Sequence, residues 1–244
     1  MSDLIPVVID GKTIEVERDT TVLEAARRLG IEIPTLCYNE NIEPYGVCRM
    51  CIVEIDEGAR KRIAPACVYP VRQEGLVVET KSERVIRHRR MLTQLLLARA
   101  PEASVLWELA SEYGITEIHP RLKKRDDDCI LCGLCVRACA QLVGLHAIAF
   151  EGRGTERRVA APFDEEYSEC IACGTCHYVC PTDAIPIIDE GDRRILPRWH
   201  REVHMTKCAN CGRMFAPWEQ LEIFAKRTGV DKSSLKLCPD CRGR

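Results

Sequence analysis

The sequence predicts an α+β protein built from several small domains, and three observations lead to that expectation. An Asp-Gly pair at positions 10–11 separates two β-rich runs, which is a strong hairpin signal. Helix start and stop signals then flank the apolar pattern at 22–29. Sixteen cysteines stand in 244 residues and fall into four sets of four. Division among four groups of thiols leaves little for one large core, so we expect modules that a metal helps to hold.

The first domain is predicted over residues 1–80. The hairpin covers 4–16, and the helix at 22–29 begins after residues whose side chains cap helices and ends before a glycine. Further β-rich runs at 52–55 and 76–80 read as strands. Hairpin, helix and strands together indicate a small α+β domain.

The remaining boundaries follow from shifts in composition. A helical linker without cysteine is predicted over 81–120, with helices at 82–99 and 104–113. The cysteine-dense segment 121–195 begins with a charged stretch and forms the next domain. A metal-binding tail occupies 196–244, after a connector that contains Pro197.

Charge and hydropathy exclude several classes of protein. The chain has 35 Lys and Arg against 37 Asp and Glu, a net charge of −2, whereas a protein that binds nucleic-acid phosphates needs a strongly basic face. The basic run at 84–90 is therefore interpreted as a solvated helix face, with an iron–sulfur sensor that binds nucleic acid as the weaker alternative. No apolar run is long enough to span a membrane and no secretory signal is visible, so we expect a cytoplasmic location.

The first set of thiols has one tight Cys-x-x-Cys pair and two distant partners. This spacing fits a [2Fe–2S] cluster, around which a loop can wrap, although spacing alone leaves zinc open. Disulfides are disfavoured because the chain reads as intracellular. The predicted ligands are Cys37, Cys48, Cys51 and Cys67.

The second and third sets each follow the Cys-x2-Cys-x2-Cys-x3-Cys run of bacterial two-cluster ferredoxins, where the fourth cysteine of each run binds the other cluster. Structural zinc is the weaker alternative. Gly133 and Gly174 occupy matching places where the chain must turn tightly. One [4Fe–4S] cluster is assigned to Cys129, Cys132, Cys135 and Cys180. The other [4Fe–4S] cluster is assigned to Cys139, Cys170, Cys173 and Cys176.

The fourth set consists of two Cys-x-x-Cys pairs on either side of a predicted helix at 217–228. Two such pairs bring four sulfurs into a tetrahedron, which suits structural Zn²⁺. Rubredoxin-type iron has the same geometry and stays open. The predicted ligands are Cys208, Cys211, Cys238 and Cys241.

Three stretches resemble the N-terminal iron–sulfur region of the large hydrophilic subunit of respiratory complex I. They are GVCRMCIVEI (46–55), DDDCILCGLCVRAC (126–139) and CIACGTCHYVCPTDAI (170–185). They are similar also to the diaphorase iron–sulfur subunit of NAD-linked hydrogenases, bidirectional or electron-bifurcating. The resemblance implies a plant-ferredoxin-like β-grasp domain with the [2Fe–2S] cluster and a two-[4Fe–4S] ferredoxin domain. The C-terminal set lies outside it and more weakly resembles the cysteine tail of some ferredoxin-like hydrogenase and formate hydrogenlyase subunits; we expect a zinc-ribbon or rubredoxin-like module.

The sequence departs from this family between the two ferredoxin-like regions. Family members carry a His and three Cys there as ligands of a further [4Fe–4S] cluster, whereas this chain has Ala100 and Ser104 in the corresponding places. We therefore expect that cluster to be absent. His88 is interpreted as a helix-surface residue, because no cysteine lies near it in the sequence.

The resemblance implies an electron-transfer subunit of a cytoplasmic NAD(P)-linked oxidoreductase complex, most simply a hydrogenase. The chain has no phosphate-binding glycine motif, so we expect flavin, nicotinamide and the catalytic metal on partner subunits, and no substrate site of its own. Ferredoxin is a further possible partner. The alternatives are the same role in a formate or aldehyde dehydrogenase complex, or a free polyferredoxin that shuttles electrons between enzymes.

Overall fold

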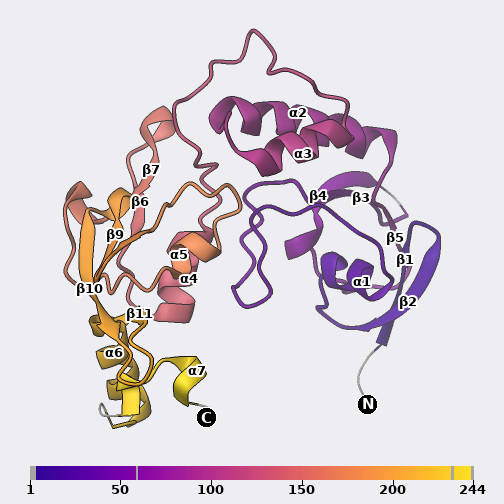
Figure 1. Ribbon diagram of the computed structural model, residues 1–244. Coiled ribbons are helices and arrows are strands. Elements are labelled where there is room, and N and C mark those ends of the chain that lie inside the picture. The colour runs from indigo at the N-terminus through magenta and orange to yellow at the C-terminus, as the bar shows by residue number, and fades with distance from the viewer. Residues whose placement is uncertain (1–3, 59, 232–233, 243–244) are drawn as a thin grey trace. The chain divides into compact units, whose positions relative to one another are not determined.

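The computed structural model describes residues 4–58, 60–231 and 234–242. The chain divides into two compact units, Met1–Cys132 and Gly133–Arg244, whose elements are labelled in Figure 1. No helix in the described part of the chain is long and apolar enough to cross a lipid bilayer.

The first unit is built on a five-stranded sheet. Its strand order is β2-β1-β5-β3-β4, with β1 and β5 parallel and every other neighbouring pair antiparallel. The strands are β1 (Leu4–Ile9), β2 (Lys12–Glu17), β3 (Ile52–Asp56), β4 (Lys61–Pro65) and β5 (Leu76–Glu79). Strands β1, β2, β3 and β5 confirm the sequence prediction, whereas β4 was not predicted.

The predicted hairpin turn and first helix are confirmed. Asp10 and Gly11 both have positive φ, at 48° and 78°, as a type I′ turn requires. Helix α1 (Val22–Arg28) begins after Thr21, whose hydroxyl accepts the Glu24 N–H while the Glu24 carboxylate accepts the Thr21 N–H. This capping box satisfies two donors that would otherwise be open at the start of the helix.

The core of the first unit lies between the sheet and α1. Val7 and Ile9 from β1, Val78 from β5 and Leu23 from α1 are fully buried in one hydrophobic cluster. Cys51 and Cys67 belong to the same cluster, so two of the predicted ligands are part of the domain core. The short 3-10 helix η1 (Ala66–Val68) carries Cys67.

The two helices of the predicted linker region are also present in the first unit. Helix α2 (Glu83–Arg99) contacts both α3 (Ser104–Glu112) and strand β3, and Figure 1 shows α2 and α3 lying side by side. Leu97 of α2 and Leu106 of α3 are fully buried. Helix α2 therefore packs against both the sheet and α3.

The second unit has short helices and two small sheets. Strands β6 (Ala149–Glu151) and β7 (Arg158–Ala160) pair with each other, and a four-stranded sheet has the order β11-β10-β9-β8. The four strands are β8 (Ile188–Glu190), β9 (Arg193–Leu196), β10 (Arg201–Lys207) and β11 (Met214–Pro217). The helices are α4 (Leu134–Ala138), the π-helix η2 (Cys139–Val143), α5 (Thr175–Tyr178), α6 (Trp218–Thr228) and α7 (Pro239–Arg242). Single 3-10 turns are η3 (Gly154–Glu156), η4 (Pro162–Asp164), η5 (Pro197–Trp199) and η6 (Ser234–Lys236).

The C-terminal part of this unit both confirms and corrects the sequence analysis. Helix α6 lies where a helix was predicted, and Gly229 ends it with a φ of 70°. The segment read as a connector around Pro197 is instead structured, because Leu196 ends strand β9 and Trp199 ends η5. Both side chains are 1% exposed, so they belong to a core that the sequence pattern did not reveal.

Candidate iron–sulfur and metal sites

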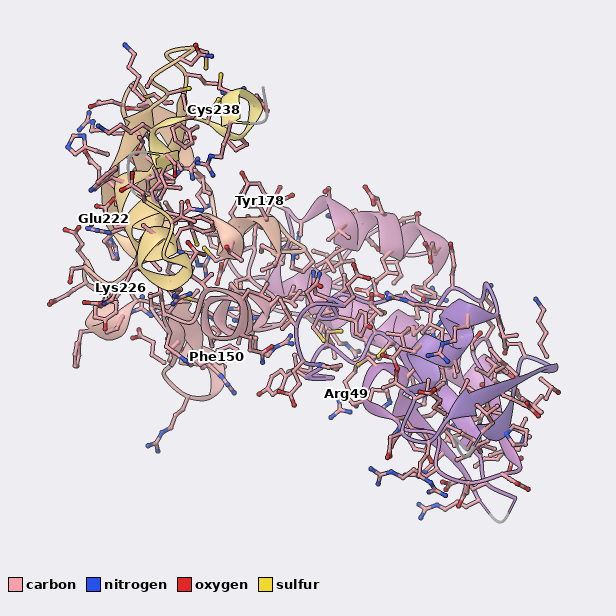
Figure 2. All side chains as sticks on the ribbon, turned by 90° about the horizontal axis from the view of Figure 1, so that it is seen from below. Arg49, Phe150, Tyr178, Glu222, Lys226 and Cys238 are labelled. Carbon is pink, nitrogen blue, oxygen red and sulfur yellow. The ribbon has the colours of Figure 1, made fainter. Side chains whose placement is uncertain are left out.

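Cys37, Cys48, Cys51 and Cys67 form what we call the N-terminal cysteine site. Cys37 lies in the loop after α1, Cys48 and Cys51 lie in the loop before β3, and Cys67 lies in η1 after β4. All four are buried. Arg49, labelled in Figure 2, stands between two of them with a φ of 60°, a left-handed conformation that turns the loop sharply.

The four thiols of this site interact as two pairs. The backbone N–H of Cys48 donates to Sγ of Cys37 at 3.5 Å, and the hydrogen bond between these two side chains raises the pKa of the Cys48 thiol. In the second pair, the side-chain hydrogen bond from Cys67 lowers the pKa of Cys51 to about 7. The charges of Cys37 and Cys48 contribute to raising the pKa of Cys67, so the two pairs lie close enough to share one site.

This donor set fits a two-iron cluster. Four cysteine thiolates are the ligands that a [2Fe–2S] cluster takes, and two pairs supply two thiolates for each iron. Burial in the domain core keeps water away from the position the cluster would occupy.

Cys139, Cys170, Cys173 and Cys176 form the middle cysteine site. They come from two segments of the second unit that are separated by about thirty residues of sequence, yet all four line one pocket. Its other walls are apolar, with Val143, Leu145, Leu196 and Trp199 among them. Burial is the main reason why the pKa of Cys176 is raised to about 12. The charges of Cys139, Cys170 and Cys173 raise this pKa further, which indicates that the four thiols lie near one another.

Hydrogen-bond donors point at the sulfurs of the middle site. The indole Nε1–H of Trp199 donates to Sγ of Cys176 at 3.3 Å, and the backbone N–H of Ala147 donates to Sγ of Cys139 at 3.3 Å. Donors of this kind stabilise thiolates and raise the reduction potential of a cluster bound to them. The apolar walls, four thiols and directed donors fit a [4Fe–4S] cluster.

The two ferredoxin-like runs repeat the same local backbone. Leu131 and Ala172, each just before the second cysteine of its run, have φ values of 53° and 49°. Gly133 and Gly174, each just after that cysteine, have φ values of 69° and 80° and precede helices α4 and α5. Both glycines are also crowded, since a Cβ on Gly174 would stand 2.8 Å from Ile187 Cδ1. The matching glycines predicted from sequence are therefore confirmed as turn positions.

The division between the two units falls inside the first run. Cys129 and Cys132 belong to the first unit, and Cys135 on α4 and Cys180 after α5 belong to the second. Within the first unit, Leu131 N–H donates to Sγ of Cys129 at 3.4 Å. The grouping of these four cysteines around one cluster remains a prediction from the sequence.

Arginines hold the backbone of both runs through carbonyl oxygens. Nε of Arg99 donates to the carbonyl of Cys129 at 2.9 Å, and Nε of Arg201 donates to the carbonyl of Cys170 at 2.7 Å. Arg201 also forms an ion pair with Glu166 at 2.7 Å. These contacts hold the cysteine-bearing loops through their backbone and leave the sulfurs open.

Cys208, Cys211, Cys238 and Cys241 form the C-terminal cysteine site. All four sulfur atoms lie within 4.8 Å of one another, and among the described residues this is the one group of three or more His, Cys, Asp or Glu ligands so closely gathered. Two segments supply them: the turn between β10 and β11, and the start of helix α7, where Cys238 is labelled in Figure 2. Cys208 and Cys238 are buried, whereas Cys211 is exposed.

The sulfur spacing of this site matches a single tetrahedral ion. Zinc–sulfur bonds of about 2.3 Å give sulfur–sulfur distances of about 3.8 Å in a tetrahedron, and the Cys211 and Cys238 sulfurs are 3.8 Å apart. Hydrogen bonds from backbone N–H groups lower the pKa of Cys208 to about 6, and the N–H of Cys211 makes the largest contribution. A lower pKa favours the thiolate that a metal requires. Nη2 of Arg213 lies 3.5 Å from Sγ of Cys238 and adds positive charge.

The segment between the two ferredoxin-like regions contributes to packing. Ala100 ends α2 and is fully buried, and the indole of Trp107 in α3 donates to the carbonyl of Pro101 at 2.7 Å. His88 lies on α2 with its Nδ1 at 2.6 Å from the carbonyl oxygen of Arg84, which agrees with its interpretation as a helix-surface residue.

Sequence reasoning missed the residues that donate hydrogen bonds to the cysteines from distant parts of the chain. Trp199 and Arg201 lie more than twenty residues from the cysteines they contact, and Arg99 lies thirty residues from Cys129. No local pattern marks them, because contacts of this kind depend on how distant segments pack.

Two family descriptions match parts of the chain. Residues 2–83 match the family described as a 2Fe-2S iron–sulfur cluster binding domain, and residues 165–185 match the family described as a 4Fe-4S binding domain. A [2Fe–2S] domain and a [4Fe–4S] domain are therefore present.

Longer similarities extend over most of the chain. It is 35% identical over 234 residues to a component of the NADH-quinone oxidoreductase of Rhizobium meliloti (strain 1021), a match that covers 86% of this chain and 27% of that protein. It is 33% identical over 213 residues to NADP-reducing hydrogenase subunit HndD of Solidesulfovibrio fructosivorans, covering 75% of this chain and 36% of that protein. The chain thus spans about a quarter to a third of the length of these curated relatives.

One solved structure is similar to this chain over most of the length of both proteins. A chain of NAD⁺-reducing [NiFe]-hydrogenase in the H2-reduced state superposes with a TM-score of 0.62 and 32% sequence identity. The match covers 74% of this chain and 86% of the hydrogenase chain.

Proposed function

The chain belongs to the iron–sulfur subunit family of that NAD⁺-reducing hydrogenase chain, and from this premise we propose that it conducts electrons inside an NAD(P)-linked oxidoreductase complex. It would bind one [2Fe–2S] cluster, two [4Fe–4S] clusters and one structural zinc ion. The observation that supports this most directly is the convergence of the N-terminal and middle sets of thiols, each buried or set in an apolar pocket.

The residues of this chain would hold and tune the clusters. When bound, the clusters supply one-electron oxidation and reduction. The N-terminal site places its four thiols in the core of the sheet domain, and the middle site directs Trp199 and the Ala147 N–H at two sulfurs. The loops themselves are fixed by arginine contacts to the carbonyls of Cys129 and Cys170.

The partner proteins follow from what the chain's relatives are. Two relatives are hydrogenase components by name, one NAD⁺-reducing and one NADP-reducing, and a third belongs to an NADH-quinone oxidoreductase. We propose a flavin- and NAD(P)-binding subunit on one side of the electron path and a catalytic hydrogenase subunit on the other. A formate or aldehyde dehydrogenase subunit could replace the hydrogenase without any change in this chain's role.

Metal and sulfide analysis of the anaerobically purified chain tests the cofactor content. We expect about ten irons, about ten sulfides and one zinc per chain. About fourteen irons would instead indicate a third [4Fe–4S] cluster and would contradict the proposal.

Ligand variants then assign each cluster to its site. Cys48→Ser is expected to remove the [2Fe–2S] EPR signal and leave the [4Fe–4S] signals, whereas Cys173→Ser is expected to damage a [4Fe–4S] cluster and spare the [2Fe–2S] signal. A complete [2Fe–2S] spectrum in Cys48→Ser would show that the ligand grouping is wrong. Co-purification with a flavoprotein distinguishes a fixed subunit from a free electron shuttle.

A further inference from the structure

Arg89 on α2 is a buried cation. Its side chain is 2% exposed, and among the described residues no other charged side chain is buried to this degree. The basic run at 84–90, interpreted from the sequence as a solvated helix face, is exposed at Arg87 and Arg90 but not at Arg89. Burial of a guanidinium is costly unless an opposite charge lies nearby, so this position calls for a counter-charge.

The groups that contact Arg89 are neutral. Its Nη2 donates to the carbonyl oxygen of Ile52 at 2.7 Å, and Tyr113 lies close enough for the charge of Arg89 to act on its phenol. Burial raises the pKa of Tyr113, which keeps the phenol uncharged. Nε of Arg89 is buried without a hydrogen-bond partner, and within the described part of the chain no carboxylate pairs with this guanidinium.

Arg201 provides the contrast within the same protein. It also donates to a backbone carbonyl of a ligand loop, that of Cys170, at 2.7 Å. Its charge, however, is balanced by Glu166 at 2.7 Å and by Glu219 at 3.6 Å. At the middle cysteine site carboxylates therefore lie within ion-pair distance of the arginine. At Arg89, Glu32 and Glu112 line the same pocket, but among the described residues neither forms an ion pair with the guanidinium.

The carbonyl that Arg89 contacts points to the missing counter-charge. Ile52 directly follows Cys51, a ligand in the N-terminal cysteine site, so the guanidinium lies roughly 10 Å or less from that sulfur. A [2Fe–2S] cluster with four thiolates carries net negative charge, because the thiolates and sulfides together outweigh the two irons. Reduction adds one further negative charge at the same place.

We propose that Arg89 is the built-in counter-charge of the [2Fe–2S] cluster and holds its reduction potential up by stabilising the reduced state. This role rests on the proposed function, since it requires a cluster at Cys37, Cys48, Cys51 and Cys67. Arg89 is a positioning residue in this scheme, because it acts on the cluster through charge and through the Ile52 carbonyl without binding iron. The cluster in turn supplies the anion that makes a buried guanidinium tolerable.

The test is an EPR-monitored redox titration of the [2Fe–2S] signal in the full-length protein. A unit charge at roughly 10 Å in surroundings with an effective dielectric constant of about 20 changes an equilibrium about tenfold. At the wild-type midpoint potential, we therefore expect Arg89→Gln to lower the ratio of reduced to oxidised cluster about tenfold. Arg89→Lys retains the charge and is expected to stay closer to wild type than Arg89→Gln. The matched control is Arg90→Gln, which removes an exposed charge one residue away and should leave the midpoint unchanged.

A second pair of variants covers the case in which Arg89→Gln does not fold. Tyr113→Asp places a carboxylate beside the intact guanidinium and should also lower the reduced-to-oxidised ratio, whereas the uncharged Tyr113→Asn should not. High salt distinguishes the source of any shift, since a buried charge is screened far less than an exposed one.

The outcomes separate this inference from the proposed function. If the wild-type protein shows no [2Fe–2S] signal, the proposed function itself fails. If the signal is present and neither Arg89→Gln nor Tyr113→Asp moves its midpoint, the charge role of Arg89 is wrong while the proposed function stands. Equal shifts in Arg89→Gln and Arg89→Lys would likewise overturn the charge role, since they would indicate that only the fit of the guanidinium matters.

Discussion

The N-terminal and C-terminal cysteine sites differ in what surrounds the same four ligands. Cys51 and Cys67 are part of a hydrophobic cluster that extends through a five-stranded sheet and α1. In the C-terminal module, a smaller cluster has Leu221, Ala225 and Leu235 as its buried members, with Phe215 and Ala216 packed against them. The sheet domain has a large apolar core of its own, whereas the apolar cluster of the C-terminal module is small, so we expect a bound metal to contribute more to the stability of that module.

The spacing of the sulfurs differs as well. The C-terminal sulfurs are all within 4.8 Å of one another, the dimension of one tetrahedral ion, whereas the N-terminal thiols interact as two pairs. This difference supports our proposal of a single structural ion at the C-terminal site and a two-iron cluster at the N-terminal site. The backbone that carries the cysteines decides between them.

Metal removal should give the largest difference between the two regions. Binding of structural zinc supplies about 10–16 kcal/mol in small zinc domains, so a zinc chelator is expected to unfold β10, β11 and α6 while β1 and β2 stay protected. Hydrogen exchange of the intact chain, followed by mass spectrometry, measures both regions in one sample. Metal analysis verifies that zinc has been lost. If α6 then stays protected from exchange, the proposed difference between the two regions is wrong.

A cavity in the core of the first unit should have the opposite effect, destabilising the sheet domain and leaving the C-terminal module unchanged. Leu23 on α1 is fully buried, and Leu23→Ala is expected to lower the free energy of unfolding of the sheet domain by about 2–5 kcal/mol. Urea titration followed by loss of [2Fe–2S] absorbance measures this effect, and the zinc content of the C-terminal site should not change. Leu4→Ala is the control, because Leu4 is 49% exposed and its truncation leaves no cavity. A similar cost for both variants would contradict this view of the core.

The middle cysteine site offers a smaller test, in which one donor is removed. Trp199→Phe keeps an aromatic ring in the pocket and deletes the N–H that donates to Cys176. Loss of a hydrogen bond to a charged sulfur costs about 1.5–3 kcal/mol, so the potential of one [4Fe–4S] cluster should become more negative. Redox titration by EPR measures this potential. Trp218→Phe is the control, because Trp218 is partly exposed. An unchanged potential would mean that the indole serves packing alone.

The helix cap of the first unit should have the smallest effect. Thr21→Ala removes the hydroxyl that accepts the Glu24 N–H and is expected to cost about 1 kcal/mol. Glu24→Gln preserves an acceptor for the Thr21 N–H and should cost less. The urea midpoint of the sheet domain measures both variants, and the reverse order would show that the charge of Glu24 matters more than the cap.

Local features of both units could be predicted from the sequence because they depend on near neighbours. Asp10-Gly11 forms its turn, Thr21 caps its helix, and Gly133 and Gly174 adopt left-handed backbone as expected. Strand β4 could not be predicted, since its Lys61–Pro65 segment becomes a strand only by pairing with β3. The sheet of the second unit escaped prediction for the same reason: its strands are short and stabilise one another through pairing.

The sequence by itself determined which cysteines could act together, because ligand spacing within a loop is set by chain geometry over a few residues. The two ferredoxin-like runs already assigned Cys139 to the set of Cys170, Cys173 and Cys176, and the structure places all four on one pocket. Only the tertiary structure turned Trp199 toward a sulfur. It alone also buried Arg89 beside the loop that carries Cys51 without giving it a described carboxylate partner. Burial and charge compensation are properties of packed, distant segments, and no local pattern in the chain records them.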